Sequence, residues 1–237
     1  LVAVSIDARN ITADLKQVPQ IIEQLKKISL RTEIIYLDAS SPTLIKRFSE
    51  SRRKHPLTTE KIGLRQAINM ETELLEQIAL LASLSIDTSY MSLHQLRESI
   101  KARVVERDES GLALMFESFG YKYGVPIDAD VVFDVRCLPN PYWEPNLRPL
   151  TGLDTEVQQW LGSQDTAESM YQDLHAYLTK WLPKFEENNR AYMTVAIGCT
   201  GGQHRSVYLS ERLKKDFANK IKNVQVMHRE LLRRDTA

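Results

Sequence analysis

The chain has 237 residues, 43% of them hydrophobic and 26% charged, which is typical of a soluble globular protein large enough for two domains. Its 31 basic side chains balance 31 acidic ones, so the net charge favours no class of partner. The chain has neither a signal peptide nor an apolar run of about 18 residues, which predicts a cytoplasmic protein without membrane attachment. Two cysteines exclude a disulfide framework and lack metal-ligand spacing, so no metal site is expected.

Residues 1–105 alternate predicted strands with predicted helices. The strands are expected at 1–7, 34–38 and 85–88, and the helices at about 12–28, 43–53, 60–84 and 92–105. This βαβ alternation predicts an α/β domain with a parallel sheet and helices on both of its faces.

Two predicted strands of this domain end in a carboxylate, Asp7 and Asp38. Ligands bind at the carboxyl edge of such sheets, and Asp38 is placed like the acidic residue that holds magnesium in a nucleoside-triphosphate site. A strand-end Asp that only caps the following turn is the alternative. No Gly-x-x-x-x-Gly-Lys-Ser/Thr segment occurs, so this sequence lacks a complete nucleotide-phosphate cradle.

Residues 106–237 form the second predicted domain, also α/β. Strands are expected at 112–119, 131–138 and 191–198, a proline-rich loop at 139–145, and the longest helix at 165–187.

The turn 199–205 of this domain joins a buried strand to a helix that begins near Ser206. Backbone N–H groups at a helix N-terminus favour an anion, Gly201 and Gly202 permit tight curvature, and Arg205 can clamp a phosphate or carboxylate. Other polar residues at neighbouring strand ends, Lys122, Asp134 and Arg136, are expected at the same rim, which predicts a site for a small phosphorylated or carboxylated metabolite. An ordinary turn with surface charges is the alternative.

The same turn contains Cys199 and Arg205-Ser206, the Cys-x5-Arg-Ser/Thr spacing of cysteine-dependent phosphatases. Gly198 replaces the His that usually precedes the cysteine, and Asp154 is the only candidate general acid. The alternative is that Cys199 fills space at the end of the strand.

Charge is distributed unevenly along the chain. Basic minus acidic side chains come to +3 for residues 1–105, −8 for 106–204 and +5 for 205–237. The basic tail, 212–237, can follow the phosphates of a structured RNA, or it can be a solvated helical face.

Several motifs together resemble the RapZ family of RNase adapter proteins over essentially the whole chain. They lie at residues 4–10 (VSIDARN), 116–120 (FESFG), 126–130 (PIDAD), 133–136 (FDVR), 138–141 (LPNP), 148–154 (RPLTGLD) and 195–207 (VAIGCTGGQHRSV). The basic end is similar to that of the enterobacterial type.

The resemblance implies a kinase-like nucleotide-binding domain followed by an α/β domain similar to a phosphofructokinase subdomain. It further implies a non-enzymatic adapter that presents a small regulatory RNA to RNase E, senses glucosamine-6-phosphate and forms a homo-oligomer, expected to be a tetramer. No cofactor is required, although ATP or GTP can bind a full-length chain, because the family's glycine-rich phosphate loop precedes the strand at which this sequence starts. With that loop, a nucleotide-hydrolysing P-loop protein is a further alternative.

The resemblance also implies roles for individual residues. The nucleotide motif is Asp7, Ala8, Arg9 and Asn10. The sugar-phosphate pocket is Lys122, Asp134, Arg136, Thr200, Gly201, Gly202, His204 and Arg205. RNA binding falls on Lys222, Arg233 and Arg234, with Arg229 as an addition. Two departures stand out, since Tyr142 replaces a His found in relatives and Asp235 interrupts the terminal basic run.

Overall fold

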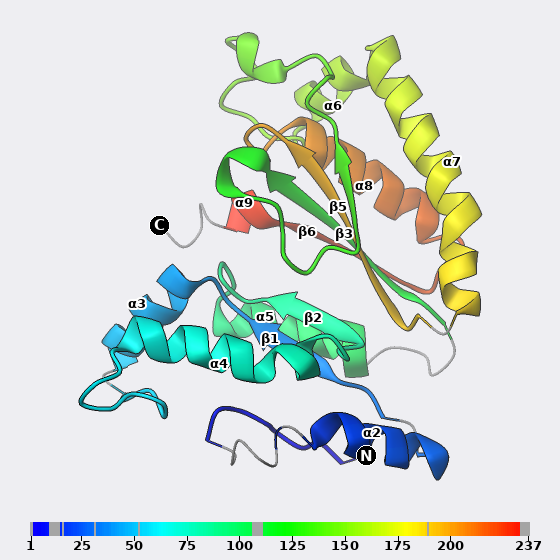
Figure 1. The fold of residues 1–237 in the computed structure, drawn as a ribbon. Coiled ribbons are helices and arrows are strands. Elements are labelled where there is room, and N and C mark those ends of the chain that lie inside the picture. The colour runs from blue at the N-terminus through cyan, green and yellow to red at the C-terminus, as the bar shows by residue number, and fades with distance from the viewer. Residues whose placement is uncertain are drawn as a thin grey trace. The chain divides into compact units, whose positions relative to one another are not determined.

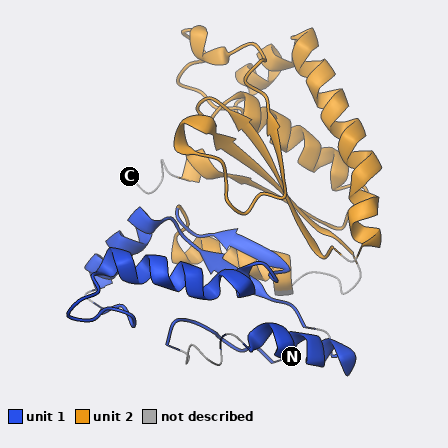
Figure 2. Cartoon of the chain, viewed as in Figure 1, with its two compact units in different colours: residues 1–89 blue, residues 90–237 orange. Residues whose placement is uncertain are grey.

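A computed structural model of the chain describes residues 2–9, 15, 17–30, 32–51, 53–105, 111–188 and 190–232 (Figure 1). The chain divides into two compact units, Leu1–Ser89 and Tyr90–Ala237 (Figure 2). No helix within the described residues is both long and apolar enough to cross a bilayer.

The first unit is built around two parallel strands, β1 (Ile35–Asp38) and β2 (Leu84–Asp87). Its helices are α2 (Val18–Lys27), α3 (Ser41–Ser51) and α4 (Leu64–Ala79). The predicted alternation of strands and helices and the parallel pairing are confirmed. Asp38 lies directly opposite Asp87, so the two strands end in neighbouring carboxylates.

The strand predicted at residues 1–7 is wrong for the residues described there. Residues 2–7 are irregular, and Val2 and Val4 are 88% and 80% exposed. The apolar run does not bury itself because no described strand pairs with it, and backbone pairing is what holds an isolated strand in place.

The predicted helix at 92–105 is divided in the structure. Helix α5 (Leu93–Ile100) begins at a capping box made by Ser92 and Gln95, and the chain continues as one π-helical turn, Lys101–Val105. This segment belongs to the second unit, because Arg103 donates to the Thr194 hydroxyl and Asn223 donates to the carbonyl of Ala102. The domain boundary expected at residue 106 stays a prediction.

The second unit contains a four-stranded sheet in the order β4-β5-β3-β6, with every neighbouring pair parallel. The strands are β3 (Ala113–Gly120), β4 (Val131–Asp134), β5 (Tyr192–Cys199) and β6 (Asn223–His228). Three of them were predicted, although β4 is shorter than expected and stops at Asp134. The α/β fold class is therefore confirmed in both units.

Three helices cover one face of this sheet, α6 (Thr155–Gly162), α7 (Asp165–Glu187) and α8 (Arg205–Phe217) (Figure 1). Alternate residues of β3 and β5, such as Phe116, Val195 and Ile197, point into the apolar core between the sheet and these helices. Helix α8 packs directly against β3, β5 and β6. The N-terminus of α8 is thereby fixed at the carboxyl edge of the sheet.

The C-terminal segment corrects a prediction about the basic tail. Instead of the helical face that was one of the alternatives, residues 223–228 form β6, which pairs with β3 along its whole length, and the RNA contact stays a prediction. A short helix, α9 (Arg229–Leu232), follows. Residues 233–237 lie outside the described residues.

Candidate functional site

The carboxyl ends of all four strands meet at one edge of the second sheet. Gly120 ends β3 beside Cys199 at the end of β5, and Asp134 ends β4 beside Gly198. Because parallel α/β sheets bind ligands outside the carboxyl ends of their strands, this edge is the candidate site. The turn 199–205 and the segments that follow β3 and β4 all start here.

Hydrogen bonds link the predicted pocket residues to one another. The backbone N–H of Lys122 donates to the carbonyl of Thr200 at 3.3 Å, and Arg205 Nη2 donates to the Thr200 hydroxyl, also at 3.3 Å. Arg205 Nη1 donates to the carbonyl of Arg136 at 2.8 Å. The three segments expected to meet at this rim are therefore directly connected.

The glycine turn, defined as residues 199–204, curls around the sulfur of Cys199. The N–H of Gly202 and the hydroxyl of Ser206 each lie 3.2 Å from Sγ, and Gly202 has a φ of 68° that favours glycine. Burial by itself raises the pKa of the Cys199 thiol, but the hydrogen bonds from Ser206, the charge of Arg205 and the Gly202 N–H together leave that pKa lowered. The turn thus stabilises negative charge at its centre.

Arg205 has a different position from the one expected of a phosphate clamp. Its side chain is buried, and Nη1 donates to two backbone carbonyls, those of Arg136 at 2.8 Å and Leu138 at 2.9 Å. Arg205 therefore fastens the loop after β4 to the start of α8. Among the cations in the predicted pocket, Lys122 and Arg136 are the exposed ones.

Arg136 is held by an ion pair and an aromatic stack at the carboxyl edge of the sheet. Its guanidinium forms a bidentate pair with Asp134, with an Nη2–Oδ2 distance of 2.6 Å, and stacks on the ring of Tyr121, 3.9 Å from the centroid. Hydrogen bonds from Arg136 hold the pKa of Asp134 below its usual value, and burial raises the pKa of Tyr121. Tyr121 was not among the predicted site residues, although its position as an aromatic residue next to Lys122 at the end of a strand could have indicated it.

Gly198 is explained by this stack. A Cβ at position 198 would lie 2.4 Å from Cζ of Phe119 and 2.6 Å from Cε2 of Tyr121. The absence of a side chain lets both rings lie across the end of β5. The glycine in the position where phosphatases usually have a His is therefore needed for the packing of Tyr121.

The loop 151–154 closes over the first turn of α8. A Cβ on Gly152 would be 2.3 Å from the carbonyl oxygen of His204, and the N–H of Gly152 donates to the carbonyl of Gln203 at 2.8 Å. Asp154 accepts hydrogen bonds from the N–H and hydroxyl of Thr151, and these bonds lower its pKa. His204 itself is buried beneath this loop.

Three features count against the phosphatase alternative. The Cys199 side chain is only 2% exposed, Arg205 Nη1 is engaged by carbonyls, and the lowered pKa of Asp154 keeps it ionised rather than ready to donate a proton. The cysteine spacing is reproduced in space, but the Cys199 thiol is too buried to attack a phosphoryl group.

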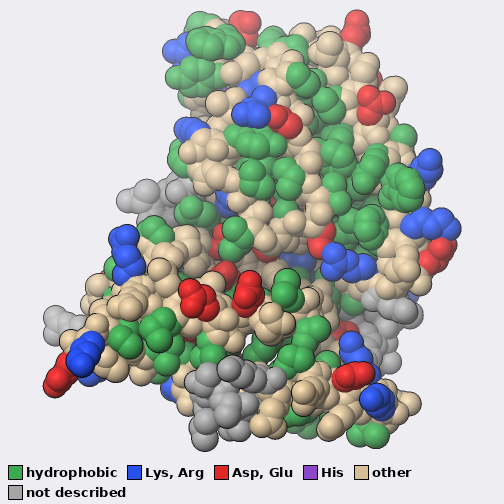
Figure 3. Space-filling view, in the orientation of Figure 1, with side chains coloured by type: hydrophobic (Ala, Val, Ile, Leu, Met, Phe, Trp, Pro, Cys, Tyr) green, Lys and Arg blue, Asp and Glu red, His purple; other side chains and the backbone are tan. Residues whose placement is uncertain are grey.

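The predicted RNA-binding residues fall into three groups. Lys222 is exposed immediately before β6. Arg229 is 5% exposed and pairs with Glu230, which corrects its grouping with solvent-facing cations. Arg233 and Arg234 lie outside the described residues. On the face shown in Figure 3, basic and acidic side chains of the described residues are interspersed, and no continuous basic surface is seen there.

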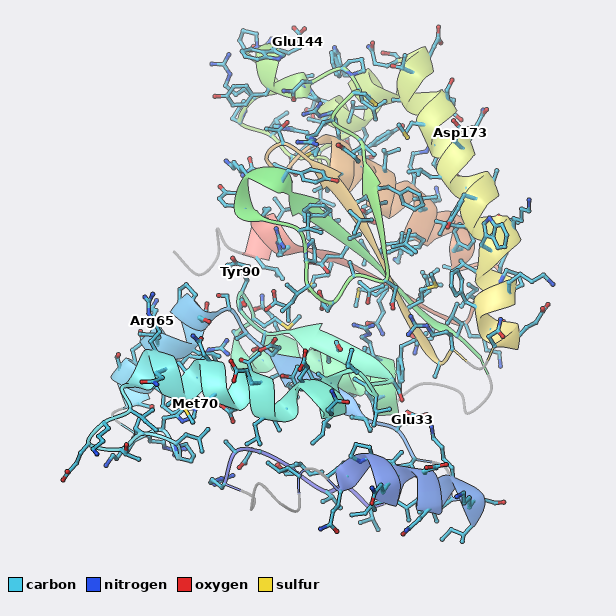
Figure 4. The ribbon with its side chains drawn as sticks, viewed as in Figure 1. Glu33, Arg65, Met70, Tyr90, Glu144 and Asp173 are labelled. Atoms are coloured by element: carbon cyan, nitrogen blue, oxygen red, sulfur yellow. The ribbon has the colours of Figure 1, made fainter. Side chains whose placement is uncertain are left out.

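The proline-rich loop carries the most exposed aromatic side chains near the site. It contains a 3-10 turn, Pro141–Trp143, in which Tyr142 is 48% exposed and stacks against Arg148, 4.9 Å from the ring centroid. Glu144 of this loop points outward (Figure 4). Tyr142 is therefore accessible to solvent.

The nucleotide motif of the first unit forms a compact local turn. Arg9 pairs with Asp7, whose pKa this pairing lowers to about 2, and the N–H of Ala8 donates to Glu71 Oε1 at 3.3 Å. Asn10 lies outside the described residues. Asp38 accepts from the N–H of Ala39 at 2.7 Å, as a capping side chain does, while burial raises its pKa. No group of three or more metal-ligating side chains is found in the described ranges.

Comparison with known proteins identifies relatives along nearly the whole chain. Residues 1–108 match the RapZ-like N-terminal domain and residues 112–232 match the RapZ C-terminal domain. A "Nucleotide-binding protein" of Ectopseudomonas mendocina is 55% identical over 97% of this chain and 81% of its own length. A "Nucleotide-binding protein in ptsO 5'region" of Pseudomonas putida (97% of this chain, 81% of its own) and a "Nucleotide-binding protein" of Cellvibrio japonicus (97% and 77%) are each 54% identical. The chain belongs to the RapZ family.

Proposed function

We propose that this protein is a non-enzymatic RNA-binding adapter whose second unit senses an amino-sugar phosphate. The observation that carries the proposal is the meeting of Lys122, Arg136 and the glycine turn at the carboxyl edge of the sheet. The family membership and the names of the relatives support nucleotide binding. The residues proposed to contact the nucleotide are Asp7, Ala8, Arg9 and Asn10.

The chemistry of the rim suits glucosamine-6-phosphate. Two exposed cations and the N–H groups of the turn supply donors for a phosphate, and Asp134 supplies an acceptor for a hydroxyl or ammonium group of the sugar. The N–H of Gly202 and the hydroxyl of Ser206 lie 3.2 Å from Cys199 Sγ, and the pKa of that thiol is lowered, which supports a turn that favours negative charge.

The proposed RNA partner is a small regulatory RNA, bound by Lys222, Arg233 and Arg234. RNase E is the proposed nuclease, and a homo-oligomer, expected to be a tetramer, presents the RNA to it. Cutting is then done by the nuclease, and the adapter contributes binding and orientation. A salt-dependent affinity is the expected signature of the phosphate contacts.

A titration of the full-length protein with a structured small RNA, with and without glucosamine-6-phosphate, tests this function. We expect the sugar phosphate to change the RNA affinity severalfold and inorganic phosphate to act more weakly. Equal RNA affinity in the presence and absence of a sugar phosphate shown by calorimetry to be bound would contradict the regulatory role. Absence of sugar-phosphate binding would contradict the assignment of the pocket.

The Cys-x5-Arg-Ser spacing, with Ser206 3.2 Å from Cys199 Sγ and a lowered pKa of that thiol, makes a cysteine-dependent phosphatase the second candidate. This candidate requires turnover of an aryl phosphate that Cys199→Ser abolishes. We expect no turnover, because the thiol is buried. Nucleotide hydrolysis by a P-loop protein is tested separately, by release of phosphate from ATP and GTP with the full-length chain.

A further inference from the structure

Glu71 is a charged residue on the inward side of helix α4. The side chains that this helix buries are Ala67, Ile68 and Ile78, and residue 71 follows Ala67 and Ile68 at the spacing that lines one face of a helix. A carboxylate on such a face gives up water, which costs free energy unless hydrogen-bond donors replace it. The donors around Glu71 therefore indicate what the residue does.

Glu71 receives a donor at each of its carboxylate oxygens. The N–H of Ala8 donates to Oε1 at 3.3 Å, and His55 Nε2 lies 2.9 Å from Oε2. The His55 side chain is 0% exposed, its ring centroid lies 5.0 Å from that of Phe48, and its Nδ1 accepts from the N–H of Leu57 at 3.2 Å. Because Nδ1 accepts, the imidazole proton is on Nε2, and His55 donates it to Glu71.

This arrangement requires a carboxylate at position 71. Glutamate accepts at both oxygens, whereas glutamine, which has the same shape, offers one oxygen and one NH2 group. An amide would serve Ala8 or His55 but not both, since each of them presents an N–H. The chemistry of Glu71 is thus matched to joining the backbone of Ala8 to a buried histidine.

Glu71 also acts on the carboxyl edge of the first sheet. Burial raises the pKa of Asp38 at the end of β1, and the negative charges of Asp87 and Glu71 add to that rise. Ala8 is buried, whereas the side chain of Arg9 beside it is 76% exposed. A bond at Ala8 therefore holds an exposed guanidinium near the edge at which α/β sheets bind ligands.

We propose that Glu71 and His55 are positioning residues for nucleotide binding by the first unit. The inference rests on the proposed nucleotide contact of residues 7–10 and names the side chains that hold this segment in place. Glu71 fixes the backbone of Ala8, and His55 fixes the carboxylate of Glu71. A turn that is held before the nucleotide arrives loses less conformational entropy on binding, which strengthens the complex.

Calorimetric titrations of the full-length protein with GTP and with ATP test this role. The variants are Glu71→Gln, Arg9→Ala and the two combined, with Glu73→Gln as the matched control. Glu73 lies on the same helix and is exposed, so its replacement removes the same charge without touching the turn. Each variant is first shown by thermal denaturation to be folded at the temperature of the titration.

We expect Glu71→Gln to weaken nucleotide binding about twofold to tenfold, as the loss of one hydrogen bond does, and Glu73→Gln to bind like the wild type. Because Glu71 acts through the turn that carries Arg9, adding Glu71→Gln to Arg9→Ala should weaken binding by less than Glu71→Gln does alone. A merely structural role would lower the stability of the protein without this non-additive effect on affinity.

Wild-type affinity in Glu71→Gln, or strictly additive effects in the combined variant, overturns the inference and leaves the proposed nucleotide contact intact. Absence of binding to the wild type, or unchanged binding in Arg9→Ala, overturns the nucleotide contact of residues 7–10 and the inference with it. If Glu71→Gln does not fold, Glu71→Asp supplies the same test, since its shorter side chain cannot reach both donors.

The part played by His55 is tested by His55→Phe. This variant keeps a ring against Phe48 and removes the donor to Glu71. We expect it to weaken nucleotide binding less than Glu71→Gln does, because the carboxylate can still accept from Ala8. Wild-type affinity in His55→Phe overturns the role of His55.

Discussion

The same local turn occurs once in each unit, as Asp7-Ala-Arg9 and as Asp134-Val-Arg136. In both, the N–H of the arginine donates to the aspartate Oδ1 at 2.9 Å, and Nη2 donates to Oδ2 at 2.6 Å. The arginine Nε bridges both carboxylate oxygens, at 3.0 and 3.1 Å in the first turn and 2.9 and 3.0 Å in the second. Three residues of sequence are enough to specify this geometry.

The two turns differ in what supports them. The turn at 134 follows a paired strand, stacks on Tyr121 and is fastened through its backbone by Arg205. The turn at 7 follows an irregular segment, and the N–H of Ala8 donates to Glu71. The turn at 134 is thus built into the end of a sheet and is bonded by a buried arginine. Four experiments examine the difference between the two turns.

The largest effect is expected from removing the buried fastening, with Arg205→Met. The carbonyls of Arg136 and Leu138 lose their donor inside the protein, so the free energy of unfolding should fall by about 2–5 kcal/mol. Chemical denaturation measures this. The control is Arg148→Met, whose exposed guanidinium donates to the Tyr142 carbonyl and whose loss should change stability by about 0.5 kcal/mol or less. Equal losses in the two variants would show that burial is not the reason for the effect.

The stack beneath Arg136 is the next target. Gly198→Ala places a methyl group against Phe119 and Tyr121 and should lower the free energy of unfolding by about 1–3 kcal/mol through overpacking. Gly201→Ala is the matched control, because open space surrounds its Cβ and its backbone tolerates a side chain. Thermal denaturation of both variants measures the change in stability. An unchanged stability of Gly198→Ala would refute the packing argument.

A ligand titration separates the two turns by function. Arg136→Ala should weaken glucosamine-6-phosphate binding about tenfold to a hundredfold, which is the usual contribution of hydrogen bonds to a charged group. Arg9→Ala removes the equivalent arginine of the other turn and should leave the affinity unchanged. Calorimetry on both variants measures the difference, and a comparable loss in Arg9→Ala would place the ligand elsewhere.

The smallest effect concerns the carboxylates themselves. Both aspartates have a lower pKa in the folded protein than in the unfolded chain, where it is about 3.9, so each stabilises the fold fully above that pH. This stabilisation is lost as the pH falls through the folded pKa, which is about 2 for Asp7. Arg9→Gln should return the pKa of Asp7 most of the way to its model-peptide value. Arg136→Gln should return that of Asp134 less far, because Arg205 also lowers it. Carboxyl NMR titrations measure the aspartate pKa in each variant. An equal return of the two pKa values would show that Arg205 does not lower the pKa of Asp134.

Much of the fold followed from periodicity alone. Apolar strands at the end of a βαβ unit, as in β1, β3 and β5, were predicted because they are continuous and bounded by polar turns. The segment 1–7 has the same apolar character, yet its described residues, 2–7, are irregular, because a strand also needs a neighbouring strand with which to pair. β6 was not predicted, because lysines before it and arginines after it made the segment resemble a basic surface. All of its residues are half-buried in the structure.

The location of the candidate site was predictable from the sequence, but the contacts that each of its residues makes were not. Glycines between a strand and a helix identified the turn, and parallel strand ends identified its neighbours. Whether an arginine faces solvent or a backbone carbonyl depends on side-chain packing, so Arg136 and Arg205 could not be told apart from sequence. Arg229 was grouped with surface cations for the same reason, since its partner Glu230 is adjacent in sequence and offers no distinctive spacing.

Deletion mapping of this protein has to respect the pairing of β6 with β3. Any deletion that begins before Asn223 removes the edge strand, strips β3 of its hydrogen-bonded neighbour from Ala113 to Ser118 and leaves that strand open to association with other chains. Loss of RNA binding in such a shortened protein would report aggregation as readily as a missing contact. Cuts placed after Leu232 leave the pairing whole, so the basic residues beyond it can be assayed by themselves.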